Sequence, residues 1–212
     1  MRLRRHGESS ISLGSGGVRI ADVNVDISRN CRPDVIADVR WLPFISECFR
    51  EVILSDVIEH VPSGTEPVAL QEAYRILVRN GRMILSTPNN IAIFSFLDPS
   101  RWLSGHRHYN ATTMLSLLTE AKFRVENTFS SGGIFAMIGV VWYSLVTWPA
   151  KKILRGSVPY SPNFLRRRET DEYFCWSSSK GYSLFVIAVK DTRLETTSHL
   201  FSTFQYGNLS SG

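Results

Sequence analysis

Cysteine is scarce in this chain, and Cys31, Cys48 and Cys175 lie far apart without a CxxC pair. This spacing favours neither a disulfide framework nor a structural zinc site, so we expect no metal. The first ten residues are basic but contain no apolar run, and the pattern therefore predicts no secretory signal peptide. Together these absences favour a cytoplasmic protein in a reducing compartment.

Charge is missing from residues 127–150, and Ile134–Trp148 is apolar nearly all round. That pattern predicts a helix that is buried or faces a membrane. As a helix, Ile134–Ala150 would be about 26 Å long, which is shorter than a membrane span usually requires. Three roles stay open for it: covering a sheet face, forming a homodimer contact, or lying in a membrane interface.

Acidic residues are absent between Lys151 and Arg168, a stretch that holds six basic residues. Such a block suits phosphate, lipid headgroups or nucleic acid, and it suits a solvated loop equally well. Nucleic acid ranks last, because the block does not show the interleaved aromatic pattern of a stacking platform. The apolar and basic stretches together leave peripheral membrane contact through residues 134–155 as a prediction.

Alternation and β-branched content predict strands at Ser10–Leu13, Val23–Ile27, Asp34–Asp38, Glu51–Ser55, Arg82–Thr87, Arg124–Phe129 and Tyr182–Lys190. Helices are expected at about Pro67–Val78 and Thr112–Ala121, the second capped by Asn110 or Thr112. Strands that alternate with helices indicate an α/β fold with a doubly wound, mostly parallel sheet.

The first connections are too short for this pattern. Only twelve positions separate Gly14 from Asp26, and the loop Ser28–Pro33 has six residues. Connections between parallel strands usually need a dozen residues or more. We therefore expect the first crossover helices to be shortened or missing, with one sheet face under-covered near the first three strands.

Glycines and carboxylates stand where the predicted strands end. Gly14 and Gly16 let the backbone approach a ligand closely, and Asp26 is placed to accept two hydrogen bonds from a ribose diol. With Asp38 and Asp56, three successive strand ends carry an acid, which describes one rim. Solvated loop acids are the alternative, and it is weaker for three acids than for one.

The order of these pieces resembles the class I S-adenosylmethionine-dependent methyltransferases, in a compact variant of the type 11 branch. The matching pieces are "SLGSG", "VNVDIS", "ADVRWLPF", "ILSDVIEHV", "EAYRILVRNGRMILSTPNN", "HYNATTMLSLLTEAKFRV" and "YSLFVIAVK". The resemblance implies a Rossmann-like methyltransferase sheet with an antiparallel last strand. Ser12 departs from the family, because many relatives carry an acid there.

The resemblance also implies the binding residues for the cofactor, S-adenosyl-L-methionine. Gly14, Ser15 and Gly16 would flank its methionine part, Asp26 would hold its ribose, and Asp38 and Val39 would hold its adenine. Ile27, Ser55 and Asp56 complete the expected set. The expected core is 1–131 with 181–190, joined by an apolar and basic insertion, 132–180, and followed by a weakly patterned tail, 191–212.

The expected reaction is methyl transfer to a small-molecule or saccharide acceptor, in surface-glycan or lipid-linked sugar synthesis. A hydroxyl acceptor needs a base, and "GHRHYN" offers His106 and His108. His60 reads more readily as a helix-start or packing residue. The alternative is a degenerate, non-catalytic methyltransferase-like module that works through a partner bound to the open sheet face.

Overall fold

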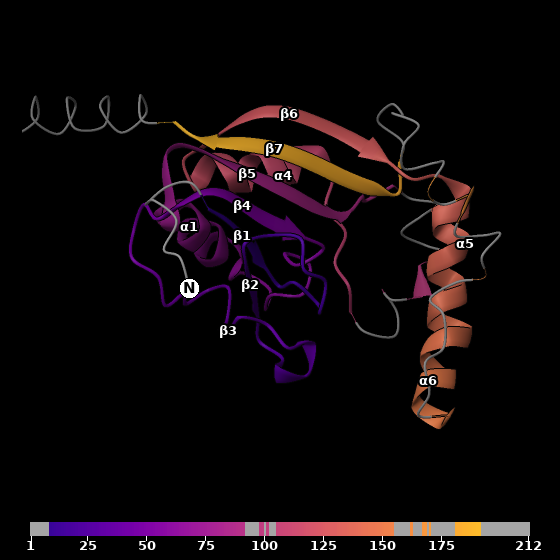
Figure 1. The fold of residues 1–212 in the computed structure, drawn as a ribbon. Helices are drawn as coiled ribbons and strands as arrows, with labels where there is room; N and C mark the ends of the chain where they lie inside the picture. The colour runs from indigo at the N-terminus through magenta and orange to yellow at the C-terminus, as the bar shows by residue number, and fades with distance from the viewer. Residues whose placement is uncertain are drawn as a thin grey trace, which may run out of the picture.

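The structure is a computed structural model that describes residues 9–91, 98–99, 101, 105–154, 162, 167–168, 170 and 181–191. One sheet has the strand order β3-β2-β1-β4-β5-β7-β6 (Figure 1). Its strands are β1 (Ser10–Leu13), β2 (Val23–Asp26), β3 (Val35–Ile36), β4 (Phe49–Ser55), β5 (Leu77–Pro88), β6 (Phe123–Ser131) and β7 (Ser183–Lys190). β1 to β5 pair in parallel, and β7 runs antiparallel to both of its neighbours. The predicted Rossmann-like sheet is confirmed.

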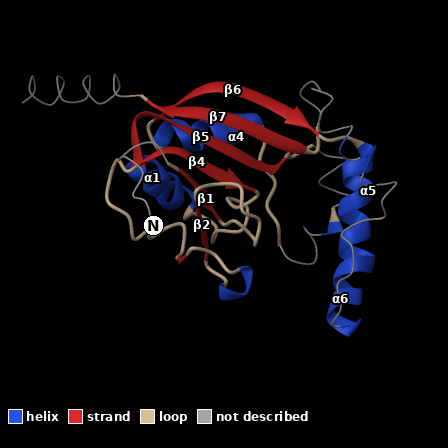
Figure 2. Ribbon diagram, in the orientation of Figure 1, coloured by secondary structure: helices blue, strands red, loops and turns tan. Residues whose placement is uncertain are grey.

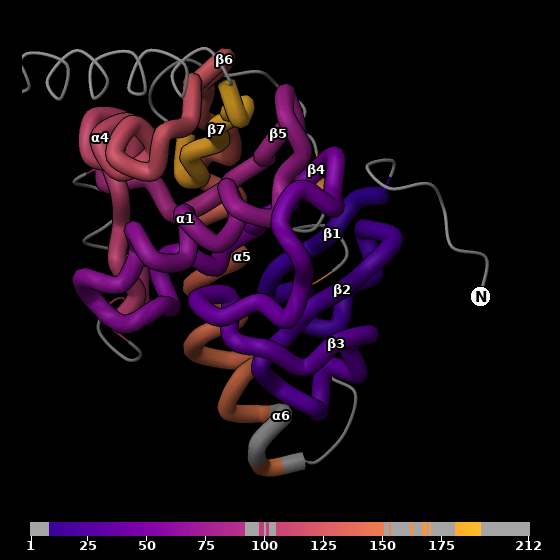
Figure 3. The backbone as a smooth tube through the Cα atoms, turned by 90° about the vertical axis from the view of Figure 1, so that its left-hand side faces the viewer, coloured from indigo at the N-terminus to yellow at the C-terminus, as the bar shows by residue number. Residues whose placement is uncertain are grey.

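Two helices, α1 (Glu66–Ile76) and α4 (Ala111–Glu120), lie side by side on one face of the sheet (Figure 3). α1 turns Ala69, Leu70, Ala73 and Ile76 into the core. The Asn110 side chain accepts the Thr113 N–H at 2.7 Å, so Asn110 rather than Thr112 is the cap of α4.

The opposite sheet face is less well covered. Side chains alternate between the two faces along a strand. In β4 and β5, Val52 and Leu54 are buried, whereas Ile53 and its paired neighbour Ile84 are half-buried. Ile187 of β7 continues this half-buried row beside Ile84. On the same face of β1 and β2, Ser12 and Asn24 are buried. The half-buried row therefore lies on β4, β5 and β7, and the prediction of an under-covered face near the first three strands does not hold for β1 and β2.

The first crossovers contain no α-helix within residues 9–91, as expected. A single 3-10 turn, η1 (Arg29–Cys31), stands between β2 and β3. Side chains hold the connections instead, because Asp34 accepts from the Arg19 guanidinium at 2.5 Å and from the Asn24 N–H at 2.9 Å. The Arg19 hydrogen bond is the largest cause that lowers the pKa of Asp34 to about 2. This clasp joins the β1–β2 turn to the approach to β3.

The apolar stretch forms nearly continuous helix through α5 (Ile134–Trp142), the π-helical turn η2 (Tyr143–Thr147) and α6 (Trp148–Leu154). This helix stands beside the end of the sheet instead of lying across it (Figure 2). Ala136 and Met137 form a small cluster with Tyr182, apart from the main core. This position excludes the first of the three predicted roles, in which the helix covers a sheet face. In the described part of the chain, no helix is long and apolar enough to cross a membrane.

Candidate cofactor pocket and acceptor side

A cavity of about 480 Å³ opens where the parallel strands end. Its walls come from the loops after β1, β2, β3 and β4, which the sheet order brings to one edge. The predicted residues that line it are Gly14, Gly16, Asp26, Ile27, Asp38, Val39 and Asp56. Ser15 and Ser55 neighbour lining residues in the sequence but do not line the cavity themselves. Ser55 Oγ lies 3.1 Å from Ser86 Oγ.

The glycine loop after β1 needs its glycines for two reasons. Gly14 and Gly16 have φ angles of +70° and +57°, a region that side chains rarely adopt. A Cβ on Gly14 would also lie 2.6 Å from Val57 Cγ2. Around Gly16 the space is open, which leaves the backbone accessible from the cavity.

Asp26 ties the glycine loop to the end of β2. Its Oδ2 accepts the Gly16 N–H and its Oδ1 accepts the Ser28 N–H, both at 2.8 Å. A carboxylate offers about four lone-pair positions, so each oxygen can still accept another hydrogen bond. The residue is 8% exposed and lines the cavity, which suits it to a diol.

Asp38 has a partner that the sequence analysis did not foresee. The Arg40 guanidinium contacts both oxygens of Asp38, with Nη2 to Oδ2 at 2.6 Å and Nε to Oδ1 at 3.0 Å. This hydrogen bonding lowers the pKa of Asp38. Arg40 also lines the cavity, so the end of β3 presents an ion pair where a lone carboxylate was expected. The separation of Asp38 and Arg40 by two positions is the only feature of the sequence that could have suggested this ion pair.

Comparison with known proteins relates this part of the chain to a known family. Residues 15–85 match the family described as a methyltransferase domain, a range that runs from the glycine loop into β5. Residues 15–85 are thus similar to a methyltransferase domain, and the chain has the fold of the class I methyltransferases. The cofactor expected for such a domain is S-adenosylmethionine. The cavity is compatible with that group, because it offers an open glycine backbone, the carboxylate of Asp26 and the buried apolar Val39.

Solved structures share the fold at low sequence identity. A candidate methyltransferase from Bacillus halodurans C-125 is 20% identical, with a TM-score of 0.59 over 88% of this chain and 94% of the other. A methyltransferase from Thermotoga maritima is 16% identical, with a TM-score of 0.59 over 89% and 84%. A phosphoethanolamine N-methyltransferase from Haemonchus contortus, bound to S-adenosylhomocysteine, is 14% identical, with a TM-score of 0.56 over 90% and 50%. No curated protein matches the chain by sequence.

The loop after β4 completes the wall of this cavity. Val57, His60, Val61 and Pro62 line it, and sequence reasoning had not assigned them to the cofactor. Glu59 turns away from solvent, is 4% exposed and accepts the Thr87 hydroxyl at 3.2 Å. Burial, followed by the neighbouring charge of Asp56, raises the pKa of Glu59 to about 8.

The two predicted histidines have different surroundings. His106 packs edge-on against His60, with ring centroids 4.2 Å apart, and so lies next to the pocket. Burial is the main cause that lowers the pKa of both rings. The His108 side chain is 2% exposed, and its Nε2 lies 3.0 Å from Asp98 Oδ2. Asp98 Oδ2 also accepts the Tyr182 hydroxyl at 3.0 Å.

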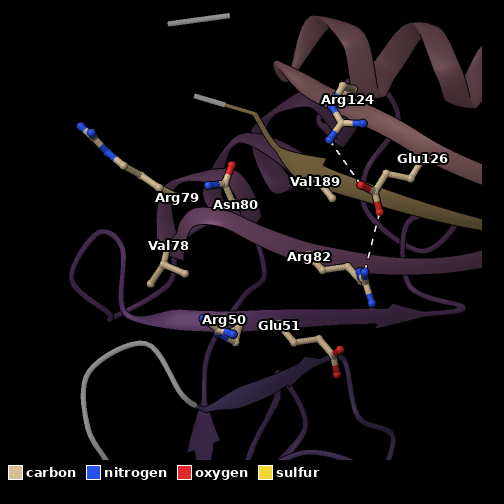
Figure 4. A pocket seen from close by; sticks show the side chains of 9 residues that line it. All are labelled: Arg50, Glu51, Val78, Arg79, Asn80, Arg82, Arg124, Glu126 and Val189. Carbon is tan, nitrogen blue, oxygen red and sulfur yellow. Dashed lines mark hydrogen bonds and ion pairs between the residues drawn. The ribbon is translucent and has the colours of Figure 1, made fainter. Parts of the chain in front are cut away.

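A second cavity of about 610 Å³ lies at the opposite edge of the sheet (Figure 4). Four arginines line it, together with Glu51 and Glu126. Glu126 lies between two of them, 3.8 Å from Arg82 and 3.3 Å from Arg124. Arg124 also donates to Asp191 at 2.7 Å. Because carboxylates already pair Arg82 and Arg124, we assign no ligand to this cavity.

Proposed function

We propose that the enzyme transfers the methyl group of S-adenosylmethionine to a hydroxyl group on a small-molecule or saccharide acceptor. The observation that carries this proposal is the pair of imidazoles, His60 and His106, directly beside the cofactor pocket. Surface-glycan or lipid-linked sugar synthesis is the setting we favour, because it is the one that the family resemblance suggests.

The bound cofactor would supply an already activated methyl group, so the protein mainly has to hold the acceptor in line. When the acceptor oxygen bonded to the methyl carbon, the methyl–sulfur bond would break and S-adenosylhomocysteine would leave. The proton of the acceptor hydroxyl would then have to pass to a base. A neutral imidazole can take that proton. Since burial lowers the pKa values of His60 and His106, both rings stay neutral at neutral pH.

Of the two candidate bases, His106 is the one we favour. It contacts a residue of the pocket wall, whereas His108 is buried against Asp98. A histidine beside a carboxylate is held in one orientation, which also suits a positioning role for His108. We therefore propose that His106 accepts the proton and that His108 and Asp98 fix the segment that carries it.

The experiment that tests the function is calorimetry with S-adenosylhomocysteine. The wild-type chain should bind it, and Asp26→Ala should weaken binding at least about tenfold, because buried hydrogen-bond partners are lost. Asp191→Ala is the matched control, since Asp191 is 9% exposed but lies at the opposite edge of the sheet. No binding by the wild-type chain would contradict the proposal.

Two alternatives remain from specific observations. The first is a non-catalytic module that binds a partner through the half-buried row Ile53, Ile84 and Ile187. Methyl transfer by the wild-type protein without a partner would contradict this alternative.

For location, we propose a protein on the cytoplasmic side that contacts membranes peripherally through residues 134–155. A homodimer through the same helix is the competing proposal.

A further inference from the structure

Four consecutive side chains, His106 to Tyr109, contact four different parts of the enzyme. His106 packs against His60, and His108 contacts Asp98. Arg107 reaches the loop after β4, and the Tyr109 hydroxyl donates to Glu66 Oε1 at 2.9 Å. The segment therefore joins His106, the proposed base, to the wall of the cofactor pocket.

Arg107 makes the densest set of these contacts. Its guanidinium donates to the carbonyl oxygens of Ile58, at 3.0 Å, of Glu59, at 3.3 Å, and of Val61. It also forms an ion pair with Glu66, the first residue of α1. Ile58, Glu59 and Val61 are buried, so their carbonyl groups would otherwise lack partners or require ordered water.

The loop that Arg107 holds is a wall of the cofactor pocket. Val57, His60 and Val61 line the pocket, and Val57 also fixes how close the glycine loop can come, because it fills the space beside Gly14. We propose that Arg107 is a positioning residue that sets this wall against the cofactor and couples it to the segment bearing His106. This inference rests on the proposed function, because it takes the cavity as the cofactor pocket.

The charge of Arg107 acts on the same wall. The pKa of His60 is lowered first by burial and next by His106; Asp56 raises it, and the Arg107 cation lowers it further. Arg107 therefore helps keep His60 neutral while it holds the backbone in place.

The test compares Arg107→Lys with Arg107→Met in full-length protein, using S-adenosylhomocysteine calorimetry. Lysine keeps the charge but cannot bridge three carbonyl groups and a carboxylate, so affinity should fall at least about tenfold. Arg107→Met should lose at least as much affinity and, by NMR titration, raise the pKa of His60, whereas Arg107→Lys should leave that pKa nearly unchanged. Arg82→Lys is the matched control, because Arg82 is 56% exposed at the opposite sheet edge (Figure 4).

Binding by a folded Arg107→Lys variant within twofold of wild type would overturn the inference, whereas failure of the wild-type chain to bind would overturn the proposed function. If neither variant folds, hydrogen exchange of the wild-type protein decides. Adding S-adenosylhomocysteine should slow amide exchange in residues 57–61 and in residues 105–109 together. Protection confined to residues 57–61 would overturn the coupling.

Discussion

Glu59 shows how one buried carboxyl group can make stability depend on pH. Its pKa of about 8 compares with an ordinary value of 4.5, and burial is the main cause. Between these two pH values the folded protein keeps the proton while the unfolded chain has lost it. Because the folded state then binds more protons, this group makes the free energy of unfolding fall as pH rises through that window.

Glu59→Gln should remove this dependence. We expect similar unfolding free energies for the variant and the wild type near pH 4.5, and a variant that is more stable than wild type at pH 8.5. Urea unfolding at several pH values measures the difference. Glu51→Gln, a half-buried acid at the far sheet edge, should leave the pH dependence unchanged. Parallel curves for Glu59→Gln and the wild type would mean that Glu59 is ionised in the folded state.

Alanine variants of His106 and His108 should have different effects in a methyl-transfer assay that uses labelled cofactor with saccharide and lipid fractions. If a hydroxyl is the acceptor, His106→Ala should lower the rate about 100-fold and leave S-adenosylhomocysteine affinity intact. His108→Ala should lower thermal stability as well as rate, because the buried Asp98 loses one hydrogen-bond partner and keeps the Tyr182 hydroxyl. The acid limb of the wild-type profile should lie below pH 6.5, since burial lowers the pKa of His106. Equal rates for wild type and His106→Ala would move the base elsewhere.

At the scale of elements, the helix from α5 to α6 presents an apolar stripe to solvent. Its exposed fractions are 64% for Ile134, 43% for Ile138, 60% for Leu145 and 77% for Ile153. Trp142 and Trp148 are exposed on the same helix, at 39% and 52%. Aromatic and aliphatic side chains of this kind suit the boundary between lipid headgroups and acyl chains.

Ile138→Glu combined with Leu145→Glu tests this stripe in vesicle co-sedimentation. The wild-type protein should bind vesicles that contain anionic lipid, and part of the binding should survive high salt, because apolar burial is not screened. The double variant should lose the salt-resistant part. Ile45→Glu with Leu115→Glu places the same charges on two other exposed apolar positions and should bind as wild type does. Absence of wild-type binding, together with a concentration-dependent dimer, would favour the homodimer contact.

At the scale of the whole molecule, the helices are unevenly distributed over the sheet. α1 and α4 cover one face, and the short first connections place no α-helix on the other within residues 9–91 (Figure 1). The candidate cofactor pocket is retained because its residues lie at strand ends, which the sheet order brings together. The short first connections therefore reduce how well helices cover the sheet, but they leave the pocket residues in place.

Local sequence patterns located the strands, the two core helices and the acids at the strand ends. They missed that α1 ends at Ile76 and that β5 already begins at Leu77, where the predicted helix ran on to Val78. Alternation and capping depend on neighbouring residues, so the short first connections and the cap at Asn110 were also readable from the chain. The ordered motifs indicated the family, which the match over residues 15–85 supports. Seven of the nine predicted cofactor residues line one cavity for the same reason, since parallel strands end at one edge.

Tertiary structure decided which side chains meet. The contacts of Arg107 with the loop after β4, of His106 with His60 and of His108 with Asp98 join segments that no local periodicity relates. The sequence also did not predict where the helix from α5 to α6 lies. An apolar pattern indicates burial or an interface, but it does not indicate which surface the helix contacts. Sequence patterns thus fixed the positions along the strands, whereas packing between distant segments selected the partners.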